Sequence, residues 1–148
     1  MILELILAYF ASLSFAFIFN LNPKAAFLSA FGGSIGWFFY SQGLLRFENT
    51  NTAYFLGAVA LSYYSEIMAR KTKTPVTSYI TPALIPLVPG SGLYRTMLQS
   101  IDGNYNGAII EGLTTLMSSG ALAIGILMVF TIIKIYYLLK RRVLDEKN

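Results

Sequence analysis

The sequence predicts an all-α membrane protein with five transmembrane helices, of which the fourth is broken. Of its 148 residues, 55% are hydrophobic and 12% are charged, whereas a soluble domain carries about 25% charged residues. A transmembrane helix needs about 20 mainly apolar residues. Five such stretches lie at residues 2–19, 24–45, 52–69, 76–98 and 107–139, and short polar linkers separate them. The chain is therefore predicted to form a single integral membrane domain, residues 1–148, ending in a basic tail at 140–148.

The first two spans have clear local signals. The N-terminus lacks the basic segment and the small-residue cleavage site of a signal peptide and carries Glu4 instead. We therefore expect residues 2–19 to be a retained helix. The second span follows Asn22 and Pro23, which are a capping residue and a residue suited to the first helical position.

The third and fifth spans differ in how well they fit the membrane. Asn51 and Thr52 predict a capped start for the third span. The fifth span has about 33 residues, or about 50 Å of helix, which is too long for one crossing. Its first part, with Glu111, is expected to lie at the outer surface or to form a separate broken segment. Near its other end, Lys134 can extend its amine to the interface.

The basic residues predict the orientation in the membrane. Five spans place alternate linkers on opposite sides, and Arg46 and Arg95 are the basic residues on one of them. By the positive-inside rule, the opposite, more basic side is cytoplasmic, so the N-terminus lies outside and the C-terminus inside. The cytoplasmic set is Lys24, Arg70, Lys71, Lys73, Lys140, Arg141, Arg142 and Lys147.

The fourth span carries the strongest functional signal. Residues 85–92 read IPLVPGSG, and Pro82 lies one turn earlier. Each proline removes a backbone donor and clashes with the preceding turn, so the helix must break. Broken helices build substrate and ion sites in many transporters, because the exposed half-helix N-terminus attracts anionic groups; the alternative is a structural kink. The substrate-path candidates here are Pro86, Pro89, Gly90 and Ser91.

A second group of polar residues precedes and enters the second span. Asn20, Asn22 and Lys24 are candidates for a polar entrance on the cytoplasmic side, and Ser34 is a further substrate-path candidate. The alternative is a capped turn followed by a helix-packing face, because residues 32–36 contain a Gly-x-x-x-Gly pair. For the glycines the packing interpretation is favoured.

Ionisable residues within spans cost about 2.5 to 3.5 kcal/mol each at the membrane centre, so each is a site hypothesis. Glu66 lies one turn before Arg70, and an i,i+4 ion pair is favoured over a role in proton transfer. Glu111 has no basic neighbour in sequence and is the better proton-coupling candidate, with a surface position as the alternative.

Tyr94 and Arg95 follow the broken segment by one turn. Arg95 is expected to pair with Asp102 or Glu111, or to hold a substrate carboxylate from the outer side. Tyr94 is a ligand candidate too, although an interface anchor is the favoured interpretation.

The composition excludes several functions. The chain has no His and no Cys, which removes thiolate and imidazole chemistry and the usual metal ligands. No Gly-x-Ser-x-Gly or Walker-type motif is present. We therefore expect no enzyme activity, no cofactor and no metal site, and the net charge of +4 is too diluted to indicate nucleic-acid binding.

Several segments together resemble one family. They are EIMARKTKTPV at 66–76, IPLVPG at 85–90 and the following Tyr94-Arg95, with weaker matches at 19–26, 33–37 and 103–105. They resemble the threonine/serine exporter family, most closely its small component, which corresponds to the C-terminal membrane half of the fused exporters.

The resemblance implies a subunit of a secondary transporter in the cytoplasmic membrane of a bacterium. It would export threonine and serine or related carboxylates, with dicarboxylates as the substrates of some relatives. It would work with a larger partner chain that carries its own five-helix half. Proton-motive force is the expected drive. Two alternatives stay open: a stand-alone homo-oligomeric exporter using a carboxylate such as Glu4, and a non-transporting membrane scaffold. Membrane lipid is a partner in every case.

Overall fold

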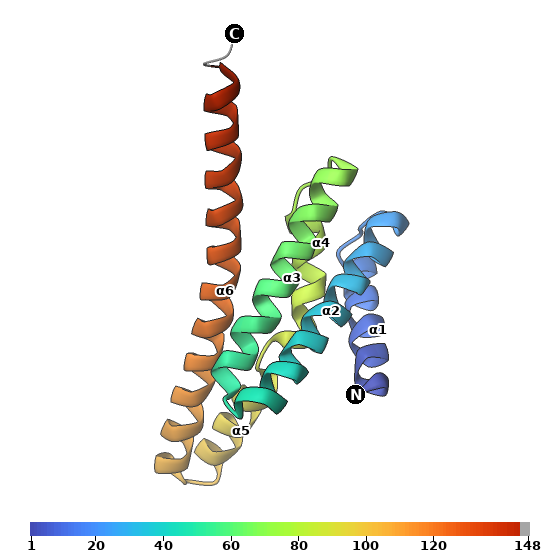
Figure 1. The fold of residues 1–148 in the computed structure, drawn as a ribbon. Coiled ribbons are helices and arrows are strands. Elements are labelled where there is room, and N and C mark those ends of the chain that lie inside the picture. The colour runs from blue at the N-terminus through green and yellow to red at the C-terminus, as the bar shows by residue number, and fades with distance from the viewer. Residues whose placement is uncertain (146–148) are drawn as a thin grey trace.

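The computed structural model describes the backbone of residues 1–145 and the side chains of residues 1–140. The described residues form six α-helices and one short 3-10 helix, without a strand (Figure 1), so the predicted all-α fold is confirmed for this part of the chain. The elements are α1 (Ile2–Ile18), α2 (Pro23–Phe47), α3 (Thr50–Thr72), α4 (Thr77–Leu84), η1 (Ile85–Leu87), α5 (Gly90–Ile101) and α6 (Tyr105–Asp145).

The fourth and fifth predicted spans differ in whether their helix is interrupted. The break expected in the fourth span is present, because this stretch is divided into α4, η1 and α5. The fifth stretch, in contrast, is one continuous helix of 41 residues. The prediction that the residues around Glu111 form a separate broken segment is therefore wrong. The glycines there lie within α6 without interrupting it, because an isolated glycine weakens a helix but leaves its hydrogen bonds in place.

The start of α2 follows its sequence signals. Pro23 is the first residue of the helix, and the side chain of Asn22 accepts a hydrogen bond from the backbone N–H of Ala25 at 2.9 Å. This bond satisfies one of the donors that every helix leaves free at its first turn.

The predicted cap of α3 is wrong by two residues. The side chain of Asn49 accepts hydrogen bonds from the N–H groups of Asn51 and Thr52, at 3.0 and 3.1 Å. The cause lies in the preceding residue: Glu48 adopts a left-handed conformation, φ 50°, that ends α2. The chain thus reverses within two residues, and α3 begins earlier than expected.

Small residues fill the interior of the bundle. Where α2, α3 and η1 meet, a Cβ added to Gly57 would lie 2.9 Å from the carbonyl oxygen of Gly36 and 2.6 Å from Leu87 Cδ2. Large apolar residues such as Ile18 and Ile110 face outward, at 70% and 66% exposure. Membrane helices pack in this way, with small residues between backbones and large ones toward lipid. Fully enclosed small residues include Ala16, Ala26, Ser29, Ala30, Ala53, Ala58, Ser62 and Ser65.

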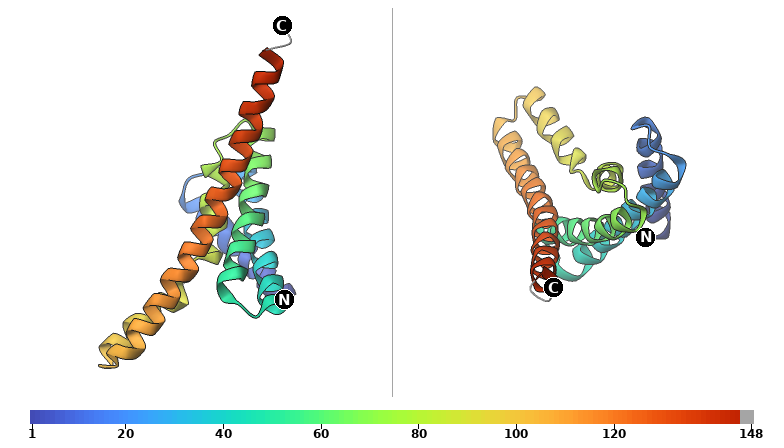
Figure 2. Two further views of the ribbon diagram at one scale, coloured as in Figure 1. Left: turned by 60° about the vertical axis from the view of Figure 1, so that its left-hand side comes forward. Right: turned by 90° about the horizontal axis from the view of Figure 1, so that it is seen from above.

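The helices form two unequal groups (Figures 1 and 2). α2 packs against α1, α3 and α4, and α6 packs against α3. α5 packs only against α6 within the described residues, so α5 and the adjoining first part of α6 extend away from the other helices. Seen from above, α4 lies end-on between α1 and this hairpin.

Length and composition alone identify fewer spans than expected. Within the described residues, α6 over Tyr105–Lys140 is the one helix long and apolar enough to cross a membrane by this measure, and α1 is a shorter apolar helix. The five-span plan therefore stays a prediction.

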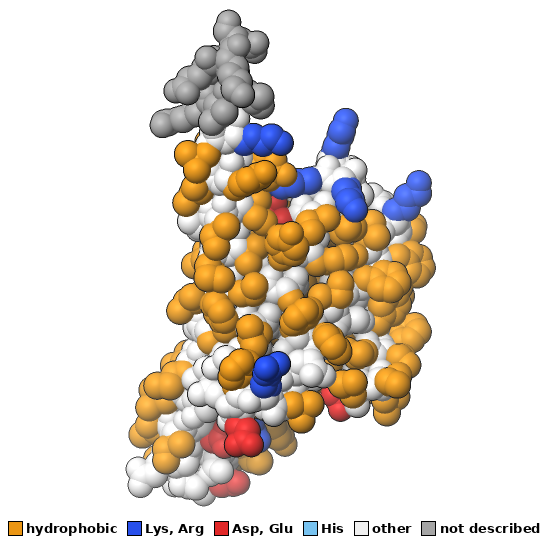
Figure 3. All heavy atoms as spheres, viewed as in Figure 1, with side chains coloured by type: hydrophobic (Ala, Val, Ile, Leu, Met, Phe, Trp, Pro, Cys, Tyr) orange, Lys and Arg blue, Asp and Glu red, His pale blue; other side chains and the backbone are white. Residues whose placement is uncertain are grey.

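Charged residues separate between the two ends of the bundle. The helix ends that carry Lys24, residues 70–73 and Lys140 lie at the same end, and the connections with Arg46 and Asp102 lie at the opposite end. On the face in Figure 3, most Lys and Arg side chains gather at the first end and most Asp and Glu side chains at the second. The predicted basic residues Arg141, Arg142 and Lys147 lie outside the described side chains.

Candidate functional site

Two prolines, Pro86 and Pro89, keep α4 and α5 from joining into one helix. Pro86 lies in η1, Val88 is extended with ψ 130°, and Pro89 precedes the first residue of α5. The N–H of Gly90 donates to the carbonyl of Val88 at 2.7 Å, a local turn that no helix contains. A Cβ at Gly90 would meet no atom within 4 Å. α5 therefore begins afresh, with open space beside its first residue.

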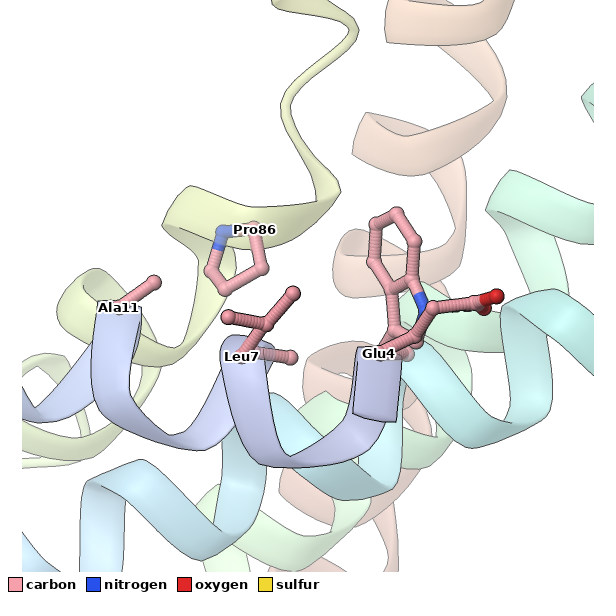
Figure 4. A pocket seen from close by; sticks show the side chains of 6 residues that line it. Glu4, Leu7, Ala11 and Pro86 are labelled. Atoms are coloured by element: carbon pink, nitrogen blue, oxygen red, sulfur yellow. Dashed lines mark hydrogen bonds between the residues drawn. The ribbon is translucent and has the colours of Figure 1, made fainter. Parts of the chain in front are cut away.

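A cavity of 260 Å³ lies beside η1, between α1 and α2 (Figure 4). Leu7 of α1 and Pro86 face each other across it. At its edge, the indole N–H of Trp37 donates to the carboxylate of Glu4 at 3.2 Å, and the amino group of Met1 lies 3.4 Å from the same carboxylate. The cavity is thus an apolar space with one carboxylate at the rim. Its lining is Glu4, Leu7, Ala8, Ala11, Trp37 and Pro86.

A second cavity, of 220 Å³, follows toward the basic end of the bundle. Its walls are Phe19 and Leu21 on one side and four residues of α4 on the other, Thr77, Ser78, Thr81 and Pro82. The two cavities lie along the same pair of segments, α1 with its following turn and α4 with η1. The two cavities share no lining residue, and we refer to them together as the α1–α4 groove. It has hydroxyl groups at one end and a carboxylate at the other.

The predicted polar entrance has structural roles near this groove. Asn20 adopts a left-handed conformation, φ 56°, in the turn after α1, and Asn22 caps α2. Lys24 is exposed in the first turn of α2. Their neighbours Phe19 and Leu21, rather than the polar residues themselves, line the second cavity.

Ser34 joins helices instead of facing the groove. Its hydroxyl donates to the carbonyl of Leu5 at 3.0 Å, linking α2 to α1. Such a bond stabilises close packing of two membrane helices.

The predicted residues on α5 lie away from the groove. Arg95 Nε is 3.5 Å from the carboxylate of Glu111, so the structure selects Glu111 over Asp102 as its partner. Tyr94 is 65% exposed, and Ser91 is exposed as well. Because α5 contacts only α6 within the described chain, this pair belongs to the hairpin.

The expected ion pair within α3 is present. Arg70 Nη2 lies 3.0 Å from the carboxylate of Glu66, whose side chain is 14% exposed. Both residues line the space between α3 and α6, on a different side of α3 from the groove.

Comparison with known families now identifies the chain. A family model described as threonine/serine exporter, ThrE, matches residues 4–132. The chain belongs to the threonine/serine exporter family. No curated protein and no solved structure matches it significantly. The exporter family places the chain among membrane transport proteins rather than enzymes.

The exporter match contains the whole groove and the break, and it ends in α6 two residues before Lys134. Sequence reasoning did not single out the α4 hydroxyls of this exporter. The signal was present, because Thr81 follows Thr77 by four residues and Ser78 by three, spacings that place it beside both on a helix. The hydrogen bond from Trp37 to Glu4 joins residues 33 apart in the sequence, and no sequence pattern predicts it.

Proposed function

We propose that this chain is a subunit of a secondary transporter that exports threonine, serine or related small carboxylates along the α1–α4 groove. The observation that carries the proposal is the interrupted helix beside this groove. Hydroxyls of Thr77, Ser78 and Thr81 suit a hydroxy amino acid, and the carboxylate of Glu4 suits an ammonium group. Interrupted helices commonly form the substrate sites of transporters.

We also infer five spans, with the N-terminus outside and the C-terminus in the cytoplasm of a bacterium. The segregation of basic residues at one end of the bundle supports this orientation. The outward large apolar side chains support an embedded bundle.

A larger partner chain with a second five-helix half is part of the proposal. The α5–α6 hairpin supports it, because within the described residues α5 packs only against α6 and leaves the rest of its surface uncovered. Two halves of opposite orientation are a common transporter plan. Proton-motive force would drive export, with Glu4, Glu66 and Glu111 as the carboxylates to test.

The test is efflux of threonine, serine and succinate from preloaded cells that hold the partner chain, with and without this chain. We expect efflux of one of these substrates to depend on this chain and to return when it is resupplied. Unchanged efflux without the chain would contradict the proposal. Efflux by this chain in cells without the partner would instead favour the stand-alone exporter.

A further inference from the structure

A cleft separates α3 from α6 at the basic end of the bundle. The two helices diverge toward this end (Figure 1). Two cavities of 390 and 470 Å³ occupy it, and Glu66, Arg70 and Tyr137 line both. We call this space the α3–α6 cleft. It is distinct from the α1–α4 groove that the proposed transport path uses.

One cation of the cleft, the Arg70 guanidinium, is held by two neighbouring side chains. The Arg70 guanidinium lies 3.8 Å from the centroid of the Tyr137 ring and 3.0 Å from the Glu66 carboxylate. Its side chain is still 42% exposed, so the guanidinium has donors left for a further acceptor. Lys134 lines the larger cavity together with Arg70. The cleft therefore contains two cations and one carboxylate.

The rest of the cleft is apolar or aromatic. Ile67, Ile132 and Ile133 line the smaller cavity, and Phe130 and Leu138 line the larger one. The rings of Tyr63 and Tyr136 also line the smaller cavity. A ligand that fits must therefore carry negative charge at one end and a long apolar body at the other.

We propose that the α3–α6 cleft binds an acidic phospholipid, with its phosphate beside Arg70 and Lys134 and its acyl chains along the isoleucines. Charge complementarity supports this occupant, since cations outnumber carboxylates in the cleft. Basic pockets between helices on the cytoplasmic side are typical sites for acidic headgroups. A small anion would leave the apolar walls uncovered. A lipid without net charge would leave the net positive charge of the cleft, including Lys134, without a counter-charge.

The test is native mass spectrometry of the purified full-length chain in mild detergent, titrated with phosphatidylglycerol or phosphatidylcholine. We expect one phosphatidylglycerol molecule to bind more tightly than phosphatidylcholine. Lys134→Gln should weaken it about fivefold, from about 1 kcal/mol per basic residue near a headgroup. Glu66→Gln should bind it at least as tightly as the unchanged chain, because a negative charge leaves the cleft.

Lys71→Gln is the matched control. It removes the same charge at the same end of the bundle, one residue after Arg70, but Lys71 lines neither cavity. Equal binding by the Lys134 and Lys71 variants would overturn the proposal, as would equal affinity for the two lipids. Displacement of phosphatidylglycerol by millimolar inorganic phosphate would also overturn it, in favour of a small-anion site.

Discussion

Replacing Pro89 and Gly90 together by alanine is expected to abolish export while the chain still inserts into the membrane. The alanine at position 89 regains an N–H that can bond the carbonyl of Ile85, so η1 and α5 can join. An interior proline disfavours a helix by about 3 kcal/mol, so its removal shifts the balance toward the continuous helix roughly a hundredfold. If export needs the interruption, efflux of whichever substrate is exported should fall about tenfold or more.

The measurement is efflux from preloaded cells, normalised to the amount of chain in the membrane fraction. Pro75→Ala with Gly120→Ala is the matched control, because it removes one proline and one glycine elsewhere. Pro75 is exposed before α4, and a Cβ at Gly120 would meet nothing within 4 Å. Export that survives in the Pro89 and Gly90 variant would show that the interruption is only a structural kink.

Gly57→Ala is expected to lower the free energy of unfolding by about 1 to 3 kcal/mol through overpacking. The added methyl group would lie 2.9 Å from the Gly36 carbonyl and 2.6 Å from Leu87. The carbonyl belongs to a helix backbone, so relief requires α2 and α3 to move apart. The same shift would displace η1, which carries Leu87, so export should weaken as well.

Denaturant unfolding of the purified chain in detergent measures this effect. Gly120→Ala is the control, and it should keep or raise stability, because alanine favours a helix by about 1 kcal/mol over glycine. Opposite signs for the two substitutions are thus expected. Similar stability of both variants would mean that the contact between α2 and α3 is looser than described.

Local backbone chemistry explains which features the sequence could predict. Pro86 and Pro89 cannot donate backbone hydrogen bonds, so the interruption follows from their identity, whereas Pro82 lies inside α4 without ending it. The Asn22 cap and the pair of Glu66 with Arg70 depend on neighbours three or four residues away. Such local signals can be read from a single sequence without knowledge of the fold.

Features that depend on packing were harder to predict. Glu48 has no residue-type signal for a left-handed conformation, so the start of α3 was misplaced. Arg95 had two carboxylate candidates, Asp102 and Glu111, and only the packing of the α5–α6 hairpin decides for Glu111, the more distant one in sequence. The groove and the cleft each join helices distant in the chain, which periodicity within one helix cannot show.

The most direct test of the transport path is the labelling rate of a single cysteine in the groove. The chain has no cysteine, so Thr81→Cys places one thiol at the exposed face of α4 beside the second cavity. A thiol reacts as its thiolate and so needs water. Ser100→Cys, exposed at the far end of α5, is the control.

If the α1–α4 groove is the path, a small water-soluble maleimide should label the cysteine at position 81 in membranes that also hold the partner. Saturating threonine, serine or succinate, whichever is exported, should slow that reaction several-fold and leave the reaction at position 100 unchanged. Labelling at position 81 that none of the three substrates slows would contradict the groove as the path.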